Sequence, residues 1–491
     1  MSANADTHAP DVLSTPAAGG LVIRGSALRV GGYGVGIALL AAASVILLRH
    51  LGVVRFGQYV TVTSIVAVAS TIADAGLTVV GSRELALLKP GEPRRRLLGN
   101  MLSLRLVIAP IGVIGGAIFA LVAGYPREML IGTLLAGGGL MLSTIQGTLL
   151  LGPVVELRNG RVAAVEVTKQ AVTVLGIALL AAAGASLTPF FAVPILVGVV
   201  AIALSRPLLG RAAIVGPRVD REVWRPLIRE ALPIAAAFVL ATLYLRIVVV
   251  LMSLVSTPVE TGLFGTSYRI LDTLTQVPTL LAGIALPLLT AAVRDGDFER
   301  LRYALQRVTE VGTTCAALIV VVTVLAADSI VVVLGGSQYA HAASVLRIQS
   351  CALLGIFLSQ FWSAAVISLH RQRELIVVNG VALAGLGVFA ALLIPRWGAN
   401  GGALAGVLGD LLLASLLLWR LRRAGPGGDV RFRFLWRVLV TGGVALAPGL
   451  IPGLPEPVVA VLGVLIFGAA AWLLGLVPRE LLDALRARRA A

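Results

Sequence analysis

Residues 231–290 read ALPIAAAFVLATLYLRIVVVLMSLVS, then TPVET, then GLFGTSYRILDTLTQVPTLLAGIALPLLT, which makes two long apolar segments joined by a short loop. Each segment is long enough to cross a bilayer, because about 20 helical residues span the ~30 Å hydrocarbon core. Each also carries charge well inside its apolar run: Arg246 in the first, and Arg269 and Asp272 in the second. The stretch therefore predicts a helical hairpin in the membrane with ionised groups at depth.

These charges allow two interpretations. An ionised side chain at such depth costs at least about 2.5–3.5 kcal/mol unless it faces protein, water or a partner. One interpretation is a structural Arg–Asp pair that holds two helices together. The other is a cationic lining for an anionic substrate, because Arg246 and Arg269 lie at similar depths on consecutive helices while Asp272 neutralises only one of them. Asp410, in a later apolar segment, is a second acid available to the remaining charge.

The composition of the whole chain identifies a polytopic membrane protein. Of its 491 residues 58% are apolar and 13% are charged, whereas soluble domains have roughly 45–50% and 25%. The formal charge of +16 does not indicate nucleic-acid binding, because the basic residues lie in alternate short loops and not on one face of a soluble domain. The cysteines and histidines are too few and too scattered to form a zinc or disulfide pattern, so we expect no metal site and no cofactor.

Apolar segments between charged loops predict an all-α fold with about 14 transmembrane helices. We expect a disordered cytoplasmic tail at 1–20, a six-helix bundle at 21–205 and a basic cytoplasmic linker at 206–229. A second six-helix bundle follows at 230–423, and two accessory helices with a basic cytoplasmic tail occupy 424–491. The spans lie near 27–48, 57–79, 101–124, 128–150, 163–183, 189–205, 231–254, 262–289, 305–327, 343–367, 375–394, 400–419, 438–452 and 457–476.

The distribution of basic residues predicts the orientation of these spans. Thirty-two of the 40 Lys and Arg residues lie in one set of alternate loops, and only four lie in the opposite set. Lys and Arg are concentrated in cytoplasmic loops, so both termini are expected in the cytoplasm. The four in the opposite set are Arg49, Arg55, Arg127 and Arg396, and the remaining four, Arg105, Arg246, Arg269 and Arg347, lie within spans.

The two six-helix segments also resemble each other locally. Phe56-Gly57 lies just inside the second helix of the first hairpin, and Phe264-Gly265 has the same place in the hairpin of the seventh and eighth spans. Six spans per segment preserve the orientation of the chain, so we expect parallel repeats. In transporters of this kind the substrate site lies between the repeats, near the middle of the membrane.

Other polar residues in or near the spans are expected to have structural roles. Arg105 begins the third span, where a long side chain ordinarily extends to the membrane surface. Asp74, near the cytoplasmic end of the second span, is expected to make a helix-end or gate contact. Glu166 and Lys169 lie three residues apart and are expected to pair. Gln146 is expected to hydrogen-bond between helices, and nothing in its surroundings indicates a ligand.

Residues 47–86, LLRHLGVVRFGQYVTVTSIVAVASTIADAGLTVVGSRELA, resemble the start of the polysaccharide transporters. These are the O-antigen or lipid-linked oligosaccharide flippases of the multidrug/oligosaccharidyl-lipid/polysaccharide exporter superfamily. In that family the first two helices join through a leucine/glycine run followed by FGxY, here Phe56-Gly57-Gln58-Tyr59. An Asp-Gly step and an Arg-Glu then close the second helix, here Asp74-Ala75-Gly76 and Arg83-Glu84. Residues 394–418, IPRWGANGGALAGVLGDLLLASLLL, resemble the family's Gly-rich turn between helices 11 and 12.

The resemblance covers roughly residues 20–425 and implies a V-shaped pair of bundles around a central cationic cavity. It implies a secondary transporter, not an enzyme, so no catalytic residues are expected. The implied activity is to flip an undecaprenyl-pyrophosphate-linked glycan across the bacterial cytoplasmic (inner) membrane for O-antigen, lipopolysaccharide or other surface-polysaccharide biosynthesis. Arginine suits a pyrophosphate because its guanidinium offers two parallel donors. Related peptidoglycan-precursor flippases use an arginine in the first helix, which adds Arg29. The cavity candidates are Arg246, Arg269, Asp272, Arg29 and Asp410.

Three other functions fit parts of the sequence. A lipid II flippase shares the implied fold and the cationic cavity. A multidrug or cation antiporter of the same fold needs membrane acids, of which Asp74, Asp272 and Asp410 are few beside the arginines. A polytopic glycan polymerase or ligase is expected to present a sizeable outer loop, and the outer loops here are short. No Walker A or other nucleotide loop occurs in the sequence. The expected energy source is therefore a Na⁺ or H⁺ gradient, the membrane potential or downstream consumption.

Overall fold

The computed structural model describes most of the chain, and the described part is helical, without strands. The expected disordered tail lies largely outside it, as does the basic tail after residue 476. Arg29 lies in a described helix, but its side chain is outside the described side chains. The described residues are 16–89, 91–156, 159–209, 215–423, 425 and 430–476, with side chains described at 36 and from 38 onward except at 159 and 206–209.

Seventeen α-helices and three short 3-10 turns make up the described fold. Several predicted spans correspond to more than one helix, and two helices cover more than one span. The α-helices are α1 (Pro16–Asp74), α2 (Leu77–Leu87), α3 (Glu92–Val122), α4 (Arg127–Val155), α5 (Asn159–Ala182), α6 (Leu187–Phe190), α7 (Val193–Leu209), α8 (Arg221–Val255), α9 (Pro258–Leu274), α10 (Gln276–Arg294), α11 (Phe298–Leu325), α12 (Ala327–Gly335), α13 (Ala342–Ser350), α14 (Ala352–Ser368), α15 (Gln372–Arg423), α16 (Leu435–Leu446) and α17 (Glu456–Leu473), and the 3-10 turns are η3 (Ser337–Tyr339), η4 (Phe432–Phe434) and η5 (Ala447–Leu450).

The protein is a multi-pass membrane protein, but the expected count of fourteen spans is not confirmed. Within the described residues, eleven helices are long and apolar enough to cross a membrane. Two of the eleven cover two predicted spans each, because α1 is kinked at Gly52 and α15 at Gly398, both with positive φ. The thirteenth predicted span is α16, whose 12 residues are shorter than the roughly 20 that a bilayer requires.

The eighth predicted span is divided near its charged residues. Helix α9 ends at Leu274 and α10 begins at Gln276. Pro278 has no N–H to donate to the Leu274 carbonyl, so a continuous helix is disfavoured there. Asp272 consequently lies in the last turn of α9, and the Thr275 hydroxyl donates to its backbone carbonyl at 2.7 Å.

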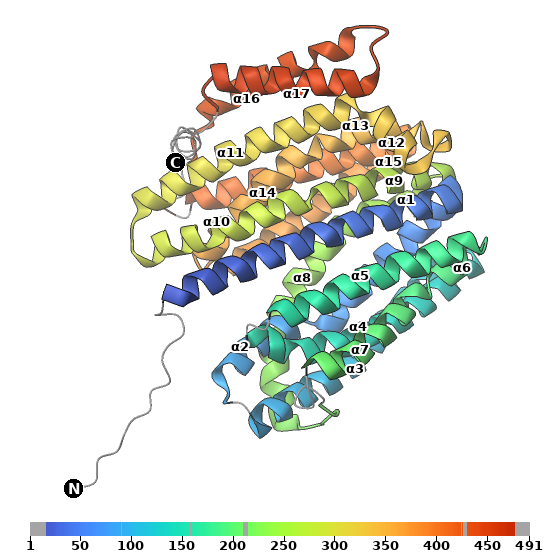
Figure 1. The fold of residues 1–491 in the computed structure, drawn as a ribbon, viewed down its shortest axis with the longest axis vertical. Helices are drawn as coiled ribbons and strands as arrows, with labels where there is room; N and C mark the ends of the chain where they lie inside the picture. The colour runs from blue at the N-terminus through green and yellow to red at the C-terminus, as the bar shows by residue number, and fades with distance from the viewer. Residues whose placement is uncertain are drawn as a thin grey trace.

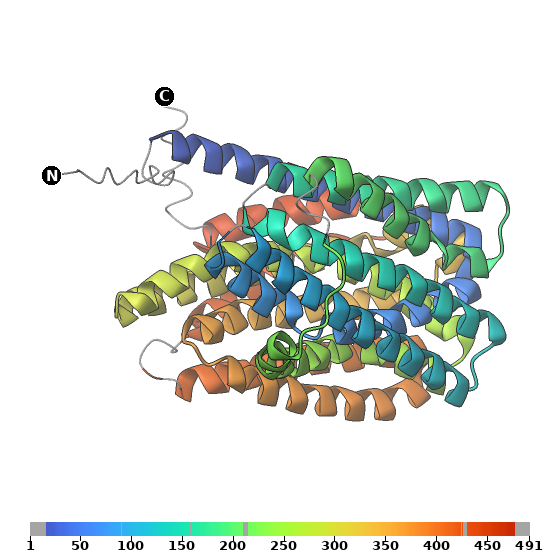
Figure 2. The same cartoon turned by 90° about the horizontal axis from the view of Figure 1, so that it is seen from below.

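Most helices lie along a common direction, whereas the first part of α8 runs across it (Figures 1 and 2). Helix α1 packs against helices from both halves of the chain. In Figure 1 its first part runs from the lower left to the upper right, and its second part returns to α2. Helix α1 contacts α5 on one side and α9 on the other, while α8 packs against α15 and α1. We call the end with Gly52 and Gly398 the hairpin end, and the end with residues 215–220 the linker end.

The last two helices pack along α11, at the upper edge of the view in Figure 1. Val321 and Leu325 of α11 are buried against Val459 and Phe467 of α17. Glu456 begins α17, and its carboxylate accepts a hydrogen bond from the Ser329 N–H of α12 at 2.7 Å. Apolar burial and this helix-end contact therefore attach the accessory pair to the rest of the bundle.

A short segment before α8 docks on the start of α3. The Arg218 N–H donates to the Gly99 carbonyl at 3.0 Å, and the Asp220 N–H donates to Asn100 Oδ1 at 2.7 Å. Arg218 pairs with Glu92, and Arg96 pairs with Asp220, whose side chain also caps α8. A Cβ on Gly99 would lie 2.8 Å from the Gly216 carbonyl oxygen, so only glycine permits this approach. The residues that form this contact are 92, 96, 99 and 100 at the start of α3 and 215–220 before α8.

The two carboxylates of this contact make it sensitive to acid. The hydrogen bond from Arg218 lowers the pKa of Glu92, and the hydrogen bond from Arg96 lowers the pKa of Asp220. Docking is therefore fully favoured above the ordinary carboxyl pKa of about 4 and weakens as the pH falls through the lowered values.

We expect Glu92→Gln with Asp220→Asn to reproduce the acid effect at neutral pH. Amide hydrogen exchange at Arg218 and Asp220, corrected for intrinsic rates, should rise about two- to fivefold, because exposed ion pairs contribute little. The matched control is Glu299→Gln, at an exposed ion pair on α11. Unchanged exchange in the double variant would show that the backbone hydrogen bonds alone hold the segment.

Candidate functional site

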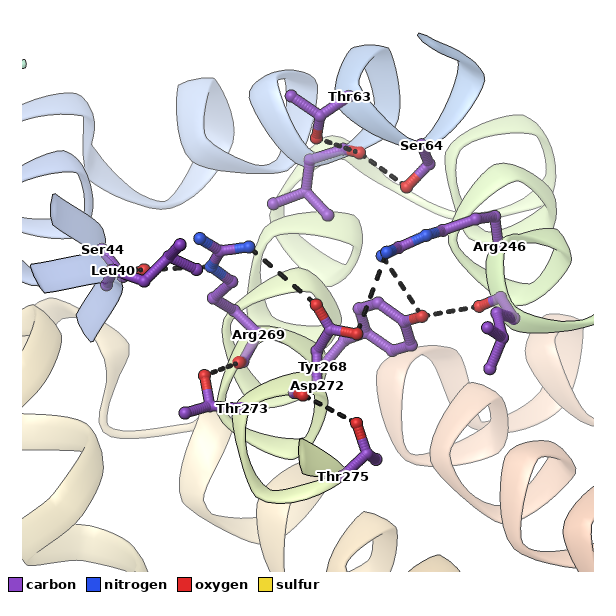
Figure 3. Close-up of polar contacts among 12 residues, drawn as sticks. Leu40, Ser44, Thr63, Ser64, Arg246, Tyr268, Arg269, Asp272, Thr273 and Thr275 are labelled. Carbon is purple, nitrogen blue, oxygen red and sulfur yellow. Dashed lines mark hydrogen bonds and ion pairs between the residues drawn. The ribbon is translucent and has the colours of Figure 1, made fainter. Parts of the chain in front are cut away.

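The structure brings Arg246, Arg269 and Asp272 together at one place on α8 and α9. Figure 3 shows Asp272 between the two arginines, which approach it from opposite sides. Arg246 comes from α8, nine residues before the helix ends at Val255, while Arg269 and Asp272 share one face of α9 at i and i+3. The similar depths inferred from the sequence thus correspond to a real cluster.

The ion pairs within this cluster are long. Arg246 Nη2 lies 3.8 Å from one oxygen of Asp272, and Arg269 Nη1 lies 4.0 Å from the other. The side chains are 25%, 34% and 30% exposed for Arg246, Arg269 and Asp272, respectively. A ligand can therefore reach all three groups. Because one carboxylate is shared by two guanidinium groups, the trio retains a net positive charge, unlike a tight one-to-one structural pair.

Two further side chains hold the arginines in place. Arg246 Nη1 donates to the Tyr268 hydroxyl at 3.3 Å, and its guanidinium carbon lies 5.5 Å from the centre of the Tyr268 ring. Arg269 Nε donates to Ser44 Oγ of α1 at 2.9 Å. Sequence reasoning missed both partners, Tyr268 and Ser44. Ser44 lies 225 residues from Arg269, and no local pattern marks it. Arg269 thereby links α9 to α1.

Asp410 lies near the cluster but makes no ion pair with another described residue. Its Oδ1 accepts a hydrogen bond from the Tyr244 hydroxyl of α8 at 2.8 Å. Asp410 still acts electrostatically on Tyr268, together with Arg246, Arg269 and Asp272. In this arrangement Asp410 is therefore paired with the neutral Tyr244 and not with the second arginine. The fifth candidate, Arg29, lies outside the described side chains.

A separate charged contact lies between α1, α3 and α4. Arg105 is only 2% exposed, so the expected extension to the membrane surface is wrong. Its Nη2 donates to Asp74 and to Thr78 at 2.5 Å, and its Nη1 donates to Thr148 at 2.8 Å. These partners satisfy most of the guanidinium in the interior, which removes the reason to extend outward. Asp74 makes the helix-end contact that the sequence predicts.

Known proteins resemble this chain in structure and not in sequence. No sequence family and no curated protein matches it. The lipid II flippase MurJ in an inward closed conformation superposes with a TM-score of 0.70 at 11% identity, covering 94% of this chain and 100% of that one. An inward-facing multidrug resistance MATE transporter has a TM-score of 0.65 at 16% identity, covering 79% and 94%. The eukaryotic MATE transporter AtDTX14 has a TM-score of 0.57 at 14% identity, covering 82% and 97%.

Identities this low establish the architecture alone. The matched proteins are transporters of related architecture, and they differ in what their names say they move. The matches extend over most of this chain and nearly all of each matched chain, so they concern the whole bundle. The chain therefore shares its fold with the lipid II flippase MurJ and with MATE transporters.

Proposed function

We propose that this protein is a secondary transporter that flips an undecaprenyl-pyrophosphate-linked oligosaccharide from the inner to the outer leaflet of a bacterial cytoplasmic membrane. Both termini and the linker end then face the cytoplasm, in accord with the loop charges. Transport proceeds by alternating access around a cationic cavity, driven by a Na⁺ or H⁺ gradient. The product serves the synthesis of a cell-surface polysaccharide such as an O-antigen.

The observation that carries this proposal is the shared carboxylate of the arginine cluster. Two arginines divide one aspartate at 3.8 and 4.0 Å, so neither is fully neutralised. A pyrophosphate carries several oxygens that accept charge-assisted hydrogen bonds, and guanidinium groups bind such oxygens in pairs. An incoming pyrophosphate can replace the Asp272 contacts with shorter ones. The cluster thus offers a binding energy that a neutral or cationic substrate would not gain.

A lipid II flippase is the second candidate, because the lipid II flippase MurJ covers 94% of this chain with a TM-score of 0.70. Lipid II presents the same pyrophosphate to the arginines and differs only in its sugars and peptide. A multidrug or cation antiporter is less favoured, since a cation would meet the net positive charge of the trio. The substrate's sugar portion therefore separates the first two candidates, and its charge separates both from the third.

Purified protein in proteoliposomes can test these assignments directly. We expect protein-dependent movement of an undecaprenyl-pyrophosphate-linked oligosaccharide, measured by the accessibility of its sugar to a membrane-impermeant lectin. Undecaprenyl pyrophosphate should compete, whereas uncharged undecaprenol should not, because only the former reaches the arginines with phosphate oxygens. The same assay with lipid II distinguishes the second candidate.

Two results would contradict the proposal. Equal competition by undecaprenol would remove the arginines from recognition, since the polyprenyl chain alone would then explain binding. Transport of an organic cation such as tetraphenylphosphonium, without transport of either lipid-linked glycan, would establish the antiporter instead. Imposed Na⁺ and H⁺ gradients, applied separately, identify the coupling ion by their effect on the initial rate.

A further inference from the structure

A partly open pocket with several polar side chains in a mainly apolar lining lies inside the N-terminal segment, away from α8 and α9. It has a volume of about 340 Å³ and is lined by α1, α4, α5 and α7. That volume is at the lower end of the range for small-molecule pockets. The polar and aromatic side chains that line it are Tyr59, Thr63, Ser70, Ser143, Gln146, Lys169 and Thr173.

The cavity contains a hydrogen-bond donor that the protein does not use. Gln146 is 2% exposed, and its Nε2 has no hydrogen-bond partner among the described residues. Its Oε1 accepts from Lys169 Nζ at 3.4 Å, so the amide is oriented with its NH₂ group left over. A buried amide without a partner costs roughly 1–3 kcal/mol, which a ligand or a water molecule in the cavity would recover.

The lining offers acceptors as well as donors. The hydroxyls of Thr63 and Ser143 donate to the carbonyls of Tyr59 and Leu140 at 2.9 and 2.8 Å, so each oxygen keeps lone pairs for another donor. Ser70 adds a further hydroxyl to the lining, and a hydroxyl can both donate and accept. Groups that both donate and accept match hydroxyl groups, which themselves do both.

The charge of the cavity favours a neutral ligand over a second phosphate. Lys169 Nζ lies 3.0 Å from Glu166 Oε1, which confirms the predicted pair. The positive charge of Lys169 is therefore largely neutralised by Glu166, in contrast to the charges of the two arginines that share Asp272. The Tyr59 ring adds an aromatic wall and stacks on Phe191 at 5.4 Å between ring centres. Aromatic faces with nearby neutral donors and acceptors suit the alternating polar and apolar surface of a sugar ring.

Tyr59 also connects this cavity to the arginine cluster. It lines the cavity, and it lies within electrostatic range of Arg269. Arg269 reaches back to α1 through Ser44, on the same helix as Tyr59. A ligand whose phosphates contact Arg269 would therefore lie near the Tyr59 side of this cavity.

We propose that this cavity of α1, α4, α5 and α7 binds a sugar of the lipid-linked glycan, with Gln146 and Lys169 as hydrogen-bond donors and Tyr59 as the aromatic wall. The inference rests on the proposed function, because it assigns the second part of the same substrate. The arginines then hold the pyrophosphate, and the N-terminal segment reads the glycan attached to it.

Binding to the purified full-length protein in nanodiscs tests the assignment with two kinds of probe lipid. One is undecaprenyl pyrophosphate, and the other is the same lipid carrying N-acetylglucosamine or galactose. We expect Gln146→Met to weaken binding of whichever sugar-carrying lipid binds the parent protein more tightly. The expected loss is about 3- to 10-fold, the range for losing one or two neutral hydrogen bonds, and binding of undecaprenyl pyrophosphate should be unaffected. Arg269→Ala should weaken both lipids. Gln360→Met, on α14 and outside this cavity, is the matched control.

A second variant keeps the test valid if Gln146→Met fails to fold. Ala67 lines the same cavity, and Ala67→Phe should fill it and abolish the gain in affinity from the sugar. Equal effects on both lipids, or no effect from either variant, would overturn the sugar assignment and leave Gln146 bound to water. If undecaprenyl pyrophosphate itself fails to bind the parent protein, the proposed function fails instead, so the two failures are distinguishable.

Discussion

Replacing either cluster arginine by alanine is expected to reduce transport of the lipid-linked glycan by about 10- to 150-fold. Each change removes a charge-assisted contact to the pyrophosphate, and such contacts contribute roughly 1.5–3 kcal/mol. Arg246→Ala and Arg269→Ala should therefore act on the same step, measured as the initial flipping rate in proteoliposomes. Lysine at either position should restore part of the rate, because it keeps the charge but not the paired donors.

Controls distinguish a substrate contact from structural damage. Arg396→Ala removes an exposed arginine at the hairpin end whose Nη1 donates to its own helix, and it should leave transport unchanged. The double variant Arg246→Met with Asp272→Leu replaces charged groups by apolar ones, which proteins often tolerate without loss of stability. If that double variant transported at the parent rate, the cluster would be a structural link between α8 and α9. Our proposal requires that it fold normally and transport poorly.

Replacing Gly262 by valine is expected to hold α1 and α9 apart at the hairpin end, where their backbones are in contact in this structure. A Cβ at Gly262 would lie 2.1 Å from the Val53 carbonyl oxygen, and a Cβ at Gly57 would lie 2.8 Å from the Gly262 nitrogen. Helices α1 and α9 therefore touch backbone to backbone, an approach that small residues permit in membrane proteins. Backbone atoms cannot move aside as a side chain can, and overpacking typically costs about 1–3 kcal/mol.

That cost corresponds to a decrease of about 5- to 150-fold in the population of the closed hairpin end. Spin labels at Arg55→Cys and Val259→Cys, both exposed at this end, report the separation by electron resonance. The background carries alanine at both native cysteines. We expect the distance distribution to move outward in Gly262→Val, together with a comparable loss of transport. Gly283→Val is the matched control, because a Cβ there meets open space. An unchanged distribution in Gly262→Val would show that this contact does not hold the end closed.

Much of the architecture follows from the sequence because the bilayer imposes a length on apolar segments. The predicted spans that contain Arg246 and Arg269 are helical, and counting residues from the hairpin loop placed the two arginines at the same depth. The helix periodicity also placed Asp272 on the face of Arg269. The predicted count of fourteen is not confirmed, since α16 is too short to cross by itself.

The partners of the polar side chains depended on the tertiary structure. Arg105 was expected at the membrane surface and is buried with Asp74 and Thr148, because α1 and α4 flank α3. The unused amide of Gln146 is evident only once α5 places Lys169 against its oxygen.

Hydrophobic length and local charge spacing are properties of a single helix, so the sequence by itself determined the class of protein, the positions of most helices and the matching levels of Arg246 and Arg269 on consecutive helices. Which helices become neighbours, and how each is rotated about its axis, is decided by packing among residues hundreds of positions apart. That packing set Tyr244 opposite Asp410, joined Arg269 to Ser44, and formed the cavity around Gln146. The charges of the cluster are thus visible in the sequence, while their arrangement, two arginines sharing one carboxylate, arises from the fold.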